Sequence, residues 1–426
     1  MNRAVIVDGV RTPFMKAGSL TSLRATTLGC DVIEHLHLNL HGFRLEDIDL
    51  VIGANVGNQV LPPDGSNLTR LIALKAGIPI KVPAFTVNIN CASGLHAILT
   101  AVKEVELGLA NCVLVVAVEV MSDYTAAYSR KQRQKFANLL TASRSKSLLK
   151  KLSSTASALV KVKIMKHDPQ WMIKLGLTDP SCNLSMDKVS DKIAEKYKIS
   201  REELDLYALE SHRRANNASD RLRGEMCSFT LNGKKELPWF YDDGVRPNQT
   251  LAALAKLKPL NEGGVTTAGN SSQITDGAVA FLIANKEWAA ARKLPVLAAM
   301  SSKNSAACGC EPSMMGLGPV GAISKLRAQG WTKMSDFSVV ETNEAFASVV
   351  LAQSKMLKEI GMGPLDWDRT NVNGGAIAIG HPISASGARL VLTCAKELQR
   401  RNQQYGLVTL CVGGGQGVAA VIENNE

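Results

Sequence analysis

The sequence predicts an α/β protein made of two similar halves, with a mainly helical domain inserted between them. Strand-like apolar runs alternate with amphipathic helical patterns at both ends of the chain, whereas residues 123–250 carry few strand patterns. The chain has 426 residues, which is more than one simple core accommodates. Its 34 glycines favour a fold with many tight turns between strands and helices.

The first half alternates strands and helices. Expected strands cover 4–10, 49–56, 84–90 and 112–122, and expected helices cover 19–40, 67–77 and 91–110. A further buried strand is expected at 277–285, after the inserted region, where the chain returns to this core. Such alternation implies a parallel or mixed sheet covered by helices.

The second half follows a similar order. Strands are expected to start at 296 and 336, a helix at 348–361, a glycine-rich turn and a helix within 370–401, and two strands within 405–423. The segments "VNINCASGLHA" and "NVNGGAIAIGHPISASGA" stand at corresponding points, which indicates an internal duplication. We therefore expect three domains, namely 1–122 with 251–285, the insertion 123–250, and 286–426. A duplicated chain of this kind could bring the ends of its halves together over one site.

The positive charge is concentrated in one segment of the insertion. The chain has a net charge of +11, and the eleven Lys and Arg residues between Arg130 and Lys166 account for all of it. Apolar residues recur there at helical spacing, so the segment 130–166 could lie on an anionic membrane, dock on a partner subunit or attract CoA phosphates. A solvated loop is the plain alternative. Nucleic-acid binding is not expected, because aromatic residues are scarce in the segment.

The cysteines and apolar runs predict the compartment. Nine cysteines at scattered positions do not form a disulfide framework, so we expect a reducing compartment such as the cytoplasm. Cys308 and Cys310 have no nearby histidine, and no metal site is predicted. The longest apolar runs, such as 112–118, are far shorter than a membrane helix, which leaves a soluble protein or one peripheral to a membrane.

The stretch "NINCASG" contains a candidate nucleophile. Cys91 falls at the expected start of a helix, where amide groups would lower the pKa of its thiol and favour the thiolate. The small residues that follow would let a substrate approach the backbone. A buried structural thiol is the alternative.

Three further segments carry groups suited to the same chemistry. His381 lies in the glycine-rich turn "GGAIAIGHPISASGAR" and could act as a general base. Cys411 precedes three glycines in "CVGGGQG", whose N–H groups could face an oxyanion. Asn343, followed by Glu344, ends an expected strand and could orient a water. Each has a structural alternative. His381 could simply bond within its turn, the glycines after Cys411 could form a plain bend, and Asn343 could cap a helix.

Together, these segments resemble the thiolase family in type and order. "VIVDGVRTPF" and "GGVTTAGNSSQITDGA" also look like thiolase segments, and the resemblance covers nearly the whole chain outside the basic insertion. It implies the thiolase fold, with two duplicated α/β halves stacked as α-β-α-β-α layers and an inserted helical loop domain. Residues 129–167 resemble the extended loop found in the thiolase subunit of fatty-acid trifunctional complexes.

The resemblance implies a separate catalytic role for each candidate residue. Cys91 would take up the acyl group, His381 would accept its proton, and Cys411 would exchange a proton with the acetyl-CoA carbanion. One oxyanion site would involve His381 and a water held by Asn343. The other would use the backbone N–H groups of Cys91 and Gly413.

The resemblance also implies substrates and partners. CoA and acyl-CoA would be substrates, and no cofactor would be bound permanently. Ser272 and Arg246 would lie near CoA, while Phe346 and Met186 would line the acyl pocket. A homodimer or homotetramer is expected, with a membrane surface or a hydratase/dehydrogenase subunit as a further partner of 130–166.

One departure from the family's pattern keeps alternatives open. Ser384 stands where the motif around His381 usually has glycine, which could alter the backbone or the activity. The expected reaction is cleavage of 3-ketoacyl-CoA in fatty-acid β-oxidation. Condensation of two acetyl-CoA molecules by an acetyl-CoA acetyltransferase and an inactive CoA- or lipid-binding subunit are the alternatives. A decarboxylating ketoacyl synthase is disfavoured, because it would not need Cys411.

Overall fold

The computed structural model describes residues 2–19, 22–58, 65, 67–124, 126–143, 170–231, 234–235 and 241–424. Its contacts divide the chain into two compact units, one formed by 1–123 with 179–426 and the other by 124–178. The sequence predicts three domains, namely two duplicated halves and the insertion 123–250, and this division remains a proposal. No helix in the part of the chain described here is long and apolar enough to span a bilayer.

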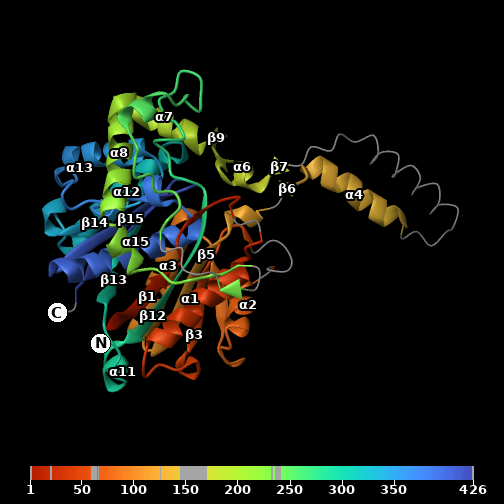
Figure 1. Cartoon of the computed structure of the whole chain (residues 1–426), viewed down its shortest axis with the longest axis vertical. Coiled ribbons are helices and arrows are strands. Elements are labelled where there is room, and N and C mark those ends of the chain that lie inside the picture. Colours follow the sequence, from red (N-terminus) through yellow and green to blue (C-terminus); the bar gives the residue numbers. More distant parts are fainter. Residues whose placement is uncertain are drawn as a thin grey trace. The chain divides into compact units, whose positions relative to one another are not determined.

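The first half contributes alternating strands and helices to the larger unit (Figure 1). The elements are β1 (Ala4–Arg11), β2 (Met15–Lys16), α1 (Ala25–Asn39), η1 (Leu45–Asp47), β3 (Leu50–Ala54), α2 (Leu68–Lys75), β4 (Ala84–Val87), the 3-10 helix η3 (Asn90–Ala92), α3 (Ser93–Glu106), β5 (Cys112–Glu119), η4 (Met121–Asp123), β12 (Thr275–Asn285) and α11 (Lys286–Ala291). The expected strand at 277–285 is thus confirmed as the core of β12.

The second half repeats this order. Its elements are β13 (Ala298–Gly309), η5 (Pro312–Leu317), α12 (Gly318–Lys325), η6 (Leu326–Gln329), η7 (Met334–Asp336), β14 (Val339–Thr342), α13 (Ala347–Glu359), α14 (Ala376–Ile379), α15 (Ile383–Arg401), β15 (Tyr405–Val412) and β16 (Gln416–Glu423). Between the halves lie β8 (Thr178–Asp179), β9 (Leu184–Ser185), α7 (Met186–Lys196), α8 (Arg201–Asn217), α9 (Ser219–Arg223), β10 (Thr230–Leu231), β11 (Lys234–Lys235) and α10 (Leu251–Ala255).

The strand pairing shows the internal duplication. The main sheet has the order β14-β15-β16-β13-β1-β12-β5-β3-β4. In the first half β3 and β5 are parallel, and β5–β12 and β12–β1 are antiparallel. In the second half β14–β15 are parallel, and β15–β16 and β16–β13 are antiparallel. The two halves therefore repeat one topology and join where β1 pairs with β13.

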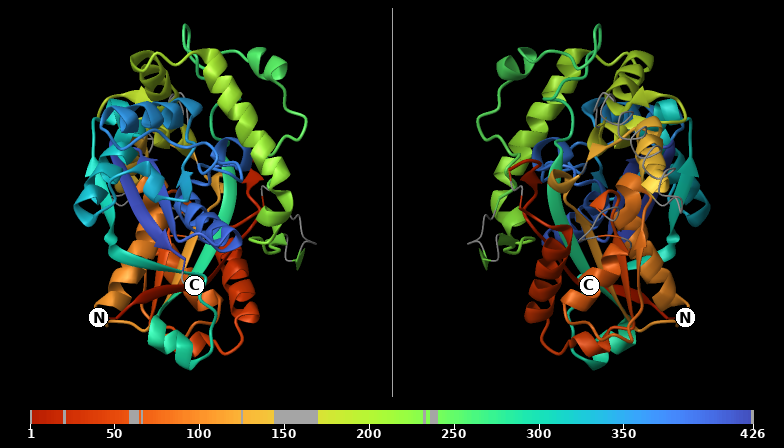
Figure 2. Two further views of the ribbon diagram at one scale, coloured as in Figure 1. Left: turned by 90° about the vertical axis from the view of Figure 1, so that its left-hand side faces the viewer. Right: turned by 90° about the vertical axis from the view of Figure 1, so that its right-hand side faces the viewer.

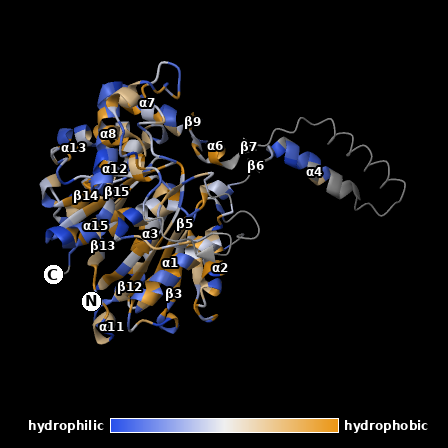
Figure 3. Cartoon of the chain, in the orientation of Figure 1, coloured by the Kyte–Doolittle hydropathy of each residue, from blue (hydrophilic) through white to orange (hydrophobic). Residues whose placement is uncertain are grey.

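Helices form layers on and between the two parts of this sheet. Helices α3 and α15 pack against each other and against strands of both halves, which makes them the central layer (Figures 1 and 2). Helices α1 and α2 cover the other face of the first half, and α12 packs on β13 and β16. Alternate residues of β1 enter different cores: Ala4 and Ile6 face α3 and α15, while Val5 and Val7 face α1. Figure 3 shows apolar residues concentrated on these strands and on α3.

Two glycines allow the central helices to approach closely. A Cβ atom on Gly94 would lie 2.5 Å from the carbonyl oxygen of Ser384, and one on Gly387 would lie 2.8 Å from the backbone nitrogen of Leu95. No larger residue fits at either crossing point. The first turns of α3 and α15 therefore lie side by side, and the residues just before each helix are brought together.

The smaller unit, 124–178, contains β6 (Ala126–Ala127), α4 (Arg130–Ser143), β7 (Gln170–Trp171) and α6 (Met172–Gly176). Helix α4 carries the start of the basic segment and is hydrophilic at its first turns (Figure 3). Most of the expected membrane or partner surface within 130–166 lies outside the described residues.

Candidate active site

Cys91 lies in a tight turn just before α3. Asn90 has a positive φ of 46°, and the turn continues through η3 into the helix. The hydroxyl of Ser93 accepts a hydrogen bond from the N–H of Ile89 (2.9 Å) and donates one to the carbonyl of Asn90 (2.7 Å). These bonds fix the turn around Cys91 just before α3.

A second turn, from the other half of the chain, meets Cys91. The N–H of Gly413 donates a hydrogen bond to the sulfur of Cys91. The side-chain amide of Asn90 donates to the carbonyl of Gly413 over 2.9 Å, so the two turns are linked in both directions. Asp179 accepts from the N–H of Gly414 at 3.0 Å and holds the same turn from outside.

The structure corrects two expectations about Cys91. Burial raises the pKa of its thiol to about 11, and the N–H of Gly413 opposes this shift only in part. The resting group is therefore a thiol and needs a base, contrary to the expected thiolate. The residues that follow do not leave the backbone open to a substrate either, because Gly94 packs on α15.

Cys411 lies at the end of β15, before the turn that contacts Cys91. It is 1 % exposed and packs in an apolar cluster with Met314 and Met315, against which Met186 and Phe346 also pack. Burial, followed by the proximity of Cys91, raises the pKa of Cys411 well above its usual range. The two sulfur atoms thus share one neighbourhood.

His381 lies two residues beyond the end of α14 and two before the start of α15. Gly380 has a φ of 112°, a conformation that favours glycine, and the N–H of His381 donates to the carbonyl of Gln273 at 2.9 Å. The ring lies between two polar groups: Nε2 is 3.5 Å from Nδ2 of Asn343, and Nδ1 is 2.5 Å from the hydroxyl of Ser386. Burial, and then the positive charge of Arg389, lower the pKa of His381 to about 4. The imidazole is therefore neutral at physiological pH.

The segment that contains Cys91 packs against the elements that carry or adjoin His381. The 3-10 helix that contains Cys91 contacts both α15 and β15. The structure thus brings Cys91, Gly413 and Cys411 to one turn, and His381 with Asn343 to the adjoining start of α15.

Comparison with known proteins agrees with this arrangement. The N-terminal domain of the thiolase family matches residues 4–287, and its C-terminal domain matches residues 294–424. The chain belongs to the thiolase family. Among its relatives, "3-ketoacyl-CoA thiolase" of Bacillus subtilis is 34% identical over 99% of this chain and 100% of its own length.

Solved thiolase structures have the same fold. The acetyl-CoA acetyltransferase of Bacillus anthracis aligns with a TM-score of 0.85 at 30% identity, over 99% of both chains. Human mitochondrial 3-ketoacyl-CoA thiolase in complex with CoA aligns with a TM-score of 0.82 at 32% identity, over 100% of this chain and 98% of its own. The expected thiolase fold is confirmed.

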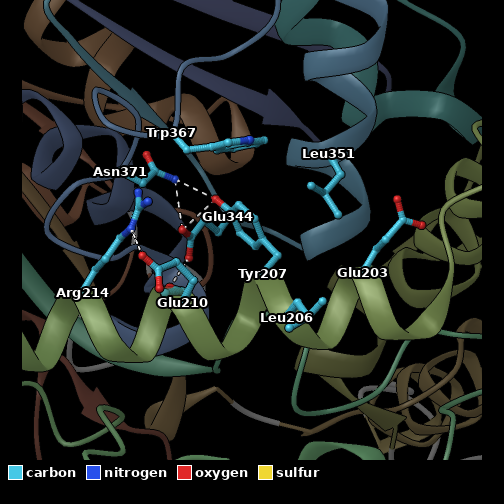
Figure 4. A pocket seen from close by; sticks show the side chains of 10 residues that line it. Glu203, Leu206, Tyr207, Glu210, Arg214, Glu344, Leu351, Trp367 and Asn371 are labelled. Atoms are coloured by element: carbon cyan, nitrogen blue, oxygen red, sulfur yellow. Dashed lines mark hydrogen bonds and ion pairs between the residues drawn. The ribbon is translucent and has the colours of Figure 1, made fainter. Parts of the chain in front are cut away.

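Asn343 directly follows β14, and hydrogen bonds of its own backbone and of the next residue, Glu344, fix its position. Its N–H donates to the carbonyl of Thr409 at 3.0 Å. The carboxylate of Glu344 accepts hydrogen bonds from Tyr207 (2.9 Å), Ser211 (2.7 Å) and Asn371 (3.0 Å). This carboxylate lines a cavity of about 380 Å³ beside α8. Figure 4 shows the side chains that line it. The Asn343 segment is thus fixed by bonds to α8 and to Asn371, and Glu344 also accepts from the N–H of Ile377 in α14 at 3.2 Å.

Ser384, the departure from the thiolase pattern, does not point at the base. Its hydroxyl donates to the carbonyl of Val118 at 2.8 Å, and its N–H donates to Glu119 at 3.1 Å. The side chain therefore ties the first turn of α15 to the end of β5. This contact removes the expected disturbance of His381.

Ser272 and Arg246, the two residues expected to lie near CoA, have different surroundings in the structure. The N–H of Ser272 donates to the carbonyl of Ala345 at 3.0 Å, beside Phe346. Arg246 is exposed, and its backbone N–H bonds to Nδ1 of His212 at 3.2 Å. Neither has a bond to the catalytic candidates in the described structure.

Sequence reasoning missed Ser386 and Glu119. Ser386 lies in the quoted "GHPISASGAR" segment, five residues after His381, and this spacing could have indicated a contact across one helical turn. Glu119 is the last residue of β5 and Cys411 the last but one of β15, and they pair with Gly277 and Gly417 at equivalent points of the two half-sheets. Only the aligned strand ends reveal this equivalence.

The resting protonation states predict the pH dependence of alkylation. The pKa of Cys91 near 11 and that of His381 near 4 leave both groups neutral between these values. Because the thiolate fraction rises with pH below the thiol's pKa, the rate of Cys91 alkylation by iodoacetamide should rise steadily from pH 5 to pH 8. A plateau that begins below pH 7 would instead indicate a resting thiolate–imidazolium pair.

Proposed function

We propose that this thiolase-family chain cleaves 3-ketoacyl-CoA with CoA, giving acetyl-CoA and an acyl-CoA shortened by two carbons, as in fatty-acid β-oxidation. The main support is the convergence of two cysteine sulfurs on one turn beside a neutral histidine. Breaking a carbon–carbon bond next to a thioester requires an acyl acceptor and a separate acid for the enolate. The two thiols are suited to these two tasks.

The first step uses Cys91 and His381. Nε2 of His381 accepts the thiol proton, and the Cys91 sulfur attacks the keto carbon of the substrate. The bond between this carbon and the adjacent methylene then breaks. The acyl group stays on Cys91 as a thioester, and acetyl-CoA leaves as an enolate.

Cys411 protonates this enolate. Its raised pKa keeps it a thiol until the carbanion forms, so a proton is available when it is needed. CoA then gives its own proton to the Cys411 thiolate and attacks the acyl thioester. Cys91 leaves and recovers its proton from His381, which restores both cysteines as thiols.

Two sets of hydrogen-bond donors stabilise the developing oxyanions. The N–H groups of Cys91 and Gly413 lie close enough to the Cys91 sulfur to lower the pKa of its thiol, and they would face the oxygen of an acyl group bound there. For the enolate oxygen we propose His381 together with a water held by Asn343. Oδ1 of Asn343 is buried without a hydrogen-bond partner among the described residues, which is unusual and suits an acceptor for water.

The remaining expected contacts are part of the proposal. Met186 and Phe346 pack against the cluster around Cys411 and would line the acyl pocket. Arg246 is exposed and suited to a CoA phosphate, and Ser272 would lie nearer the thioester end. The homodimer or homotetramer also remains a proposal.

The reverse reaction is a second candidate. The relative from Chromobacterium violaceum, 37% identical, is named acetyl-CoA acetyltransferase, and the same residues would condense two acetyl-CoA molecules. In that direction Cys411 would remove a methyl proton from the second acetyl-CoA. The inactive-subunit alternative loses its motivation, because Ser384 bonds to Val118 and not to the base.

Steady-state thiolysis across acyl chain lengths tests the proposed function. We expect loss of 3-ketoacyl-CoA absorbance with added CoA, with an optimum that reports the size of the pocket. Turnover of acetoacetyl-CoA alone would favour the acetyltransferase. Binding of substrates without turnover at any length would contradict the proposal and favour the inactive subunit.

We further propose that the basic segment 130–166 binds an anionic membrane surface. Helix α4 carries Arg130 and Arg133 exposed, which suits anionic lipid. Deleting 130–166 should reduce co-sedimentation with anionic vesicles and leave turnover of soluble substrates unchanged. A full-length variant with Arg130→Gln, Lys131→Gln, Arg133→Gln and Lys135→Gln tests the charge alone, because it keeps the segment and removes four positive charges. It should also bind anionic vesicles more weakly. Equal vesicle binding by the deletion variant would contradict this assignment.

A further inference from the structure

We propose that Ser386 is a positioning residue that holds His381 in the tautomer protonated on Nδ1, so that Nε2 is unprotonated and can take the proton of Cys91. The inference deepens the proposed function and rests on it, since it concerns how the base is set. A neutral imidazole carries one proton, and only the unprotonated nitrogen can act as a base. The position of that proton therefore decides whether His381 can work.

The bonds of the Ser386 hydroxyl fix the direction of the His381 bond. Its Oγ lies 3.0 Å from the carbonyl oxygen of Pro382 and 2.5 Å from Nδ1 of His381. A carbonyl can only accept, so the bond to Pro382 uses the single proton of the hydroxyl. Both contacts can then be hydrogen bonds only if Nδ1 is the donor and Oγ accepts from it.

The group on the opposite side of the ring indicates the same tautomer. Nε2 faces Nδ2 of Asn343, which is an amide donor. Two N–H groups pointed at each other would repel, whereas a lone pair on Nε2 accepts this contact. The hydroxyl on one side of the ring and the amide on the other therefore indicate, independently, that His381 is protonated on Nδ1.

The surroundings keep the ring in this place. Ser386 is 1 % exposed in the first turn of α15, where its bond to Pro382 spans four residues. The backbone of His381 is held by its bond to Gln273, whose side-chain amide in turn donates to the carbonyls of Ile377 and Ala378. The backbone that carries the ring is therefore fixed, and the Ser386 hydroxyl is the side-chain group bonded to Nδ1.

The choice of a hydroxyl has a consequence for charge. Ser386 orients the imidazole without adding a negative charge, and the nearby charged group on the same helix is the cation Arg389. A carboxylate in place of Ser386 would favour the imidazolium and a resting thiolate. With serine, His381 and Cys91 remain neutral until a substrate is attacked.

Variants at two serines separate orientation from packing. Ser386→Ala should lower kcat/KM for thiolysis about tenfold, since it removes the preference for one tautomer and leaves the ring that supplies general-base catalysis. Ser386→Thr keeps the hydroxyl and should restore most of the activity. Ser384→Ala is the matched control, because it also removes a buried hydroxyl from the first turn of α15, but one bonded to Val118. It should retain kcat/KM even if the melting temperature falls.

Nitrogen NMR of ¹⁵N-histidine-labelled enzyme reads the tautomer directly. The His381 signals, assigned by their loss in His381→Ala, should show Nδ1 protonated in the wild type and a shift toward protonated Nε2 in Ser386→Ala. A wild type protonated on Nε2, an unchanged tautomer in Ser386→Ala, or an equal loss of activity in Ser384→Ala would overturn the inference. The wild-type spectrum does not require turnover, so an enzyme without thiolysis would refute the proposed function and leave the tautomer test intact.

Discussion

Replacing Cys91 with alanine should abolish thiolysis, with a loss of at least about 10⁴-fold in kcat. The proposed route passes through a thioester on this sulfur, and the neighbouring thiol of Cys411 is assigned a different task, protonation of the enolate. The turn that carries Cys91 is held by the Ser93 hydroxyl and not by the thiol, so the change should leave the fold intact. Thiolysis of acetoacetyl-CoA under saturating CoA measures the effect.

A second thiol provides the control for Cys91. Cys308 on β13 is also partly exposed, and Cys308→Ser should keep wild-type turnover. If Cys91→Ala retained a persistent acetyl group after incubation with acetyl-CoA, the nucleophile would lie elsewhere.

Replacing Cys411 with alanine should separate the two halves of the reaction. Acylation of Cys91 by acetyl-CoA should persist, because transfer between thioesters breaks no carbon–carbon bond. Thiolysis should fall by about 10²- to 10⁴-fold, the usual contribution of general acid–base catalysis. Exchange of the methyl protons of acetyl-CoA with deuterium from solvent should be lost, and proton NMR of the substrate follows it.

Cys394→Ala is the matched control for this variant. Cys394 is another fully buried thiol, in α15, so both changes remove a sulfur from a packed interior. The control should retain proton exchange. Exchange at the wild-type rate in Cys411→Ala would contradict the acid–base role of Cys411.

Much of the fold could be predicted from alternation and repetition. The valine-rich run of β5 and the buried run of β12 have the lengths and compositions of core strands. The correspondence between the segments at Cys91 and His381 predicted the duplication, and the matching strand orders now show it. These features are local or repeated, so one sequence is enough to reveal them.

The electrostatics of the site could not be predicted in the same way. A helix start suggested a thiolate at Cys91, but the pKa depends on how completely the surroundings exclude water. Cys91 is half-buried, and two contacts with the other half of the chain surround it: Gly94 lets α15 approach, and the Gly413 turn bonds to Asn90. Both contacts join residues about 300 positions apart in the sequence, so no local pattern reports them.

Ser384 illustrates a further limit. The motif alone predicts that a serine in place of glycine, two residues beyond Pro382, can alter the backbone or the activity of the base at His381. The structure shows that its hydroxyl meets a carbonyl at the end of β5 in the other half of the chain. Whether an added side chain disturbs a site depends on the direction in which it points, and this direction follows from the packing of α15.

Peptide mapping of the acyl-enzyme tests the central claim most directly. Wild-type protein mixed with acetoacetyl-CoA in the absence of free CoA, and quenched in acid, should carry a single acetyl group on the peptide that contains Cys91. The peptide with Cys411 should remain unmodified. An acetyl group on Cys411, or none on either cysteine while substrate is consumed, would contradict the assignment of the nucleophile and of the two-thiol mechanism.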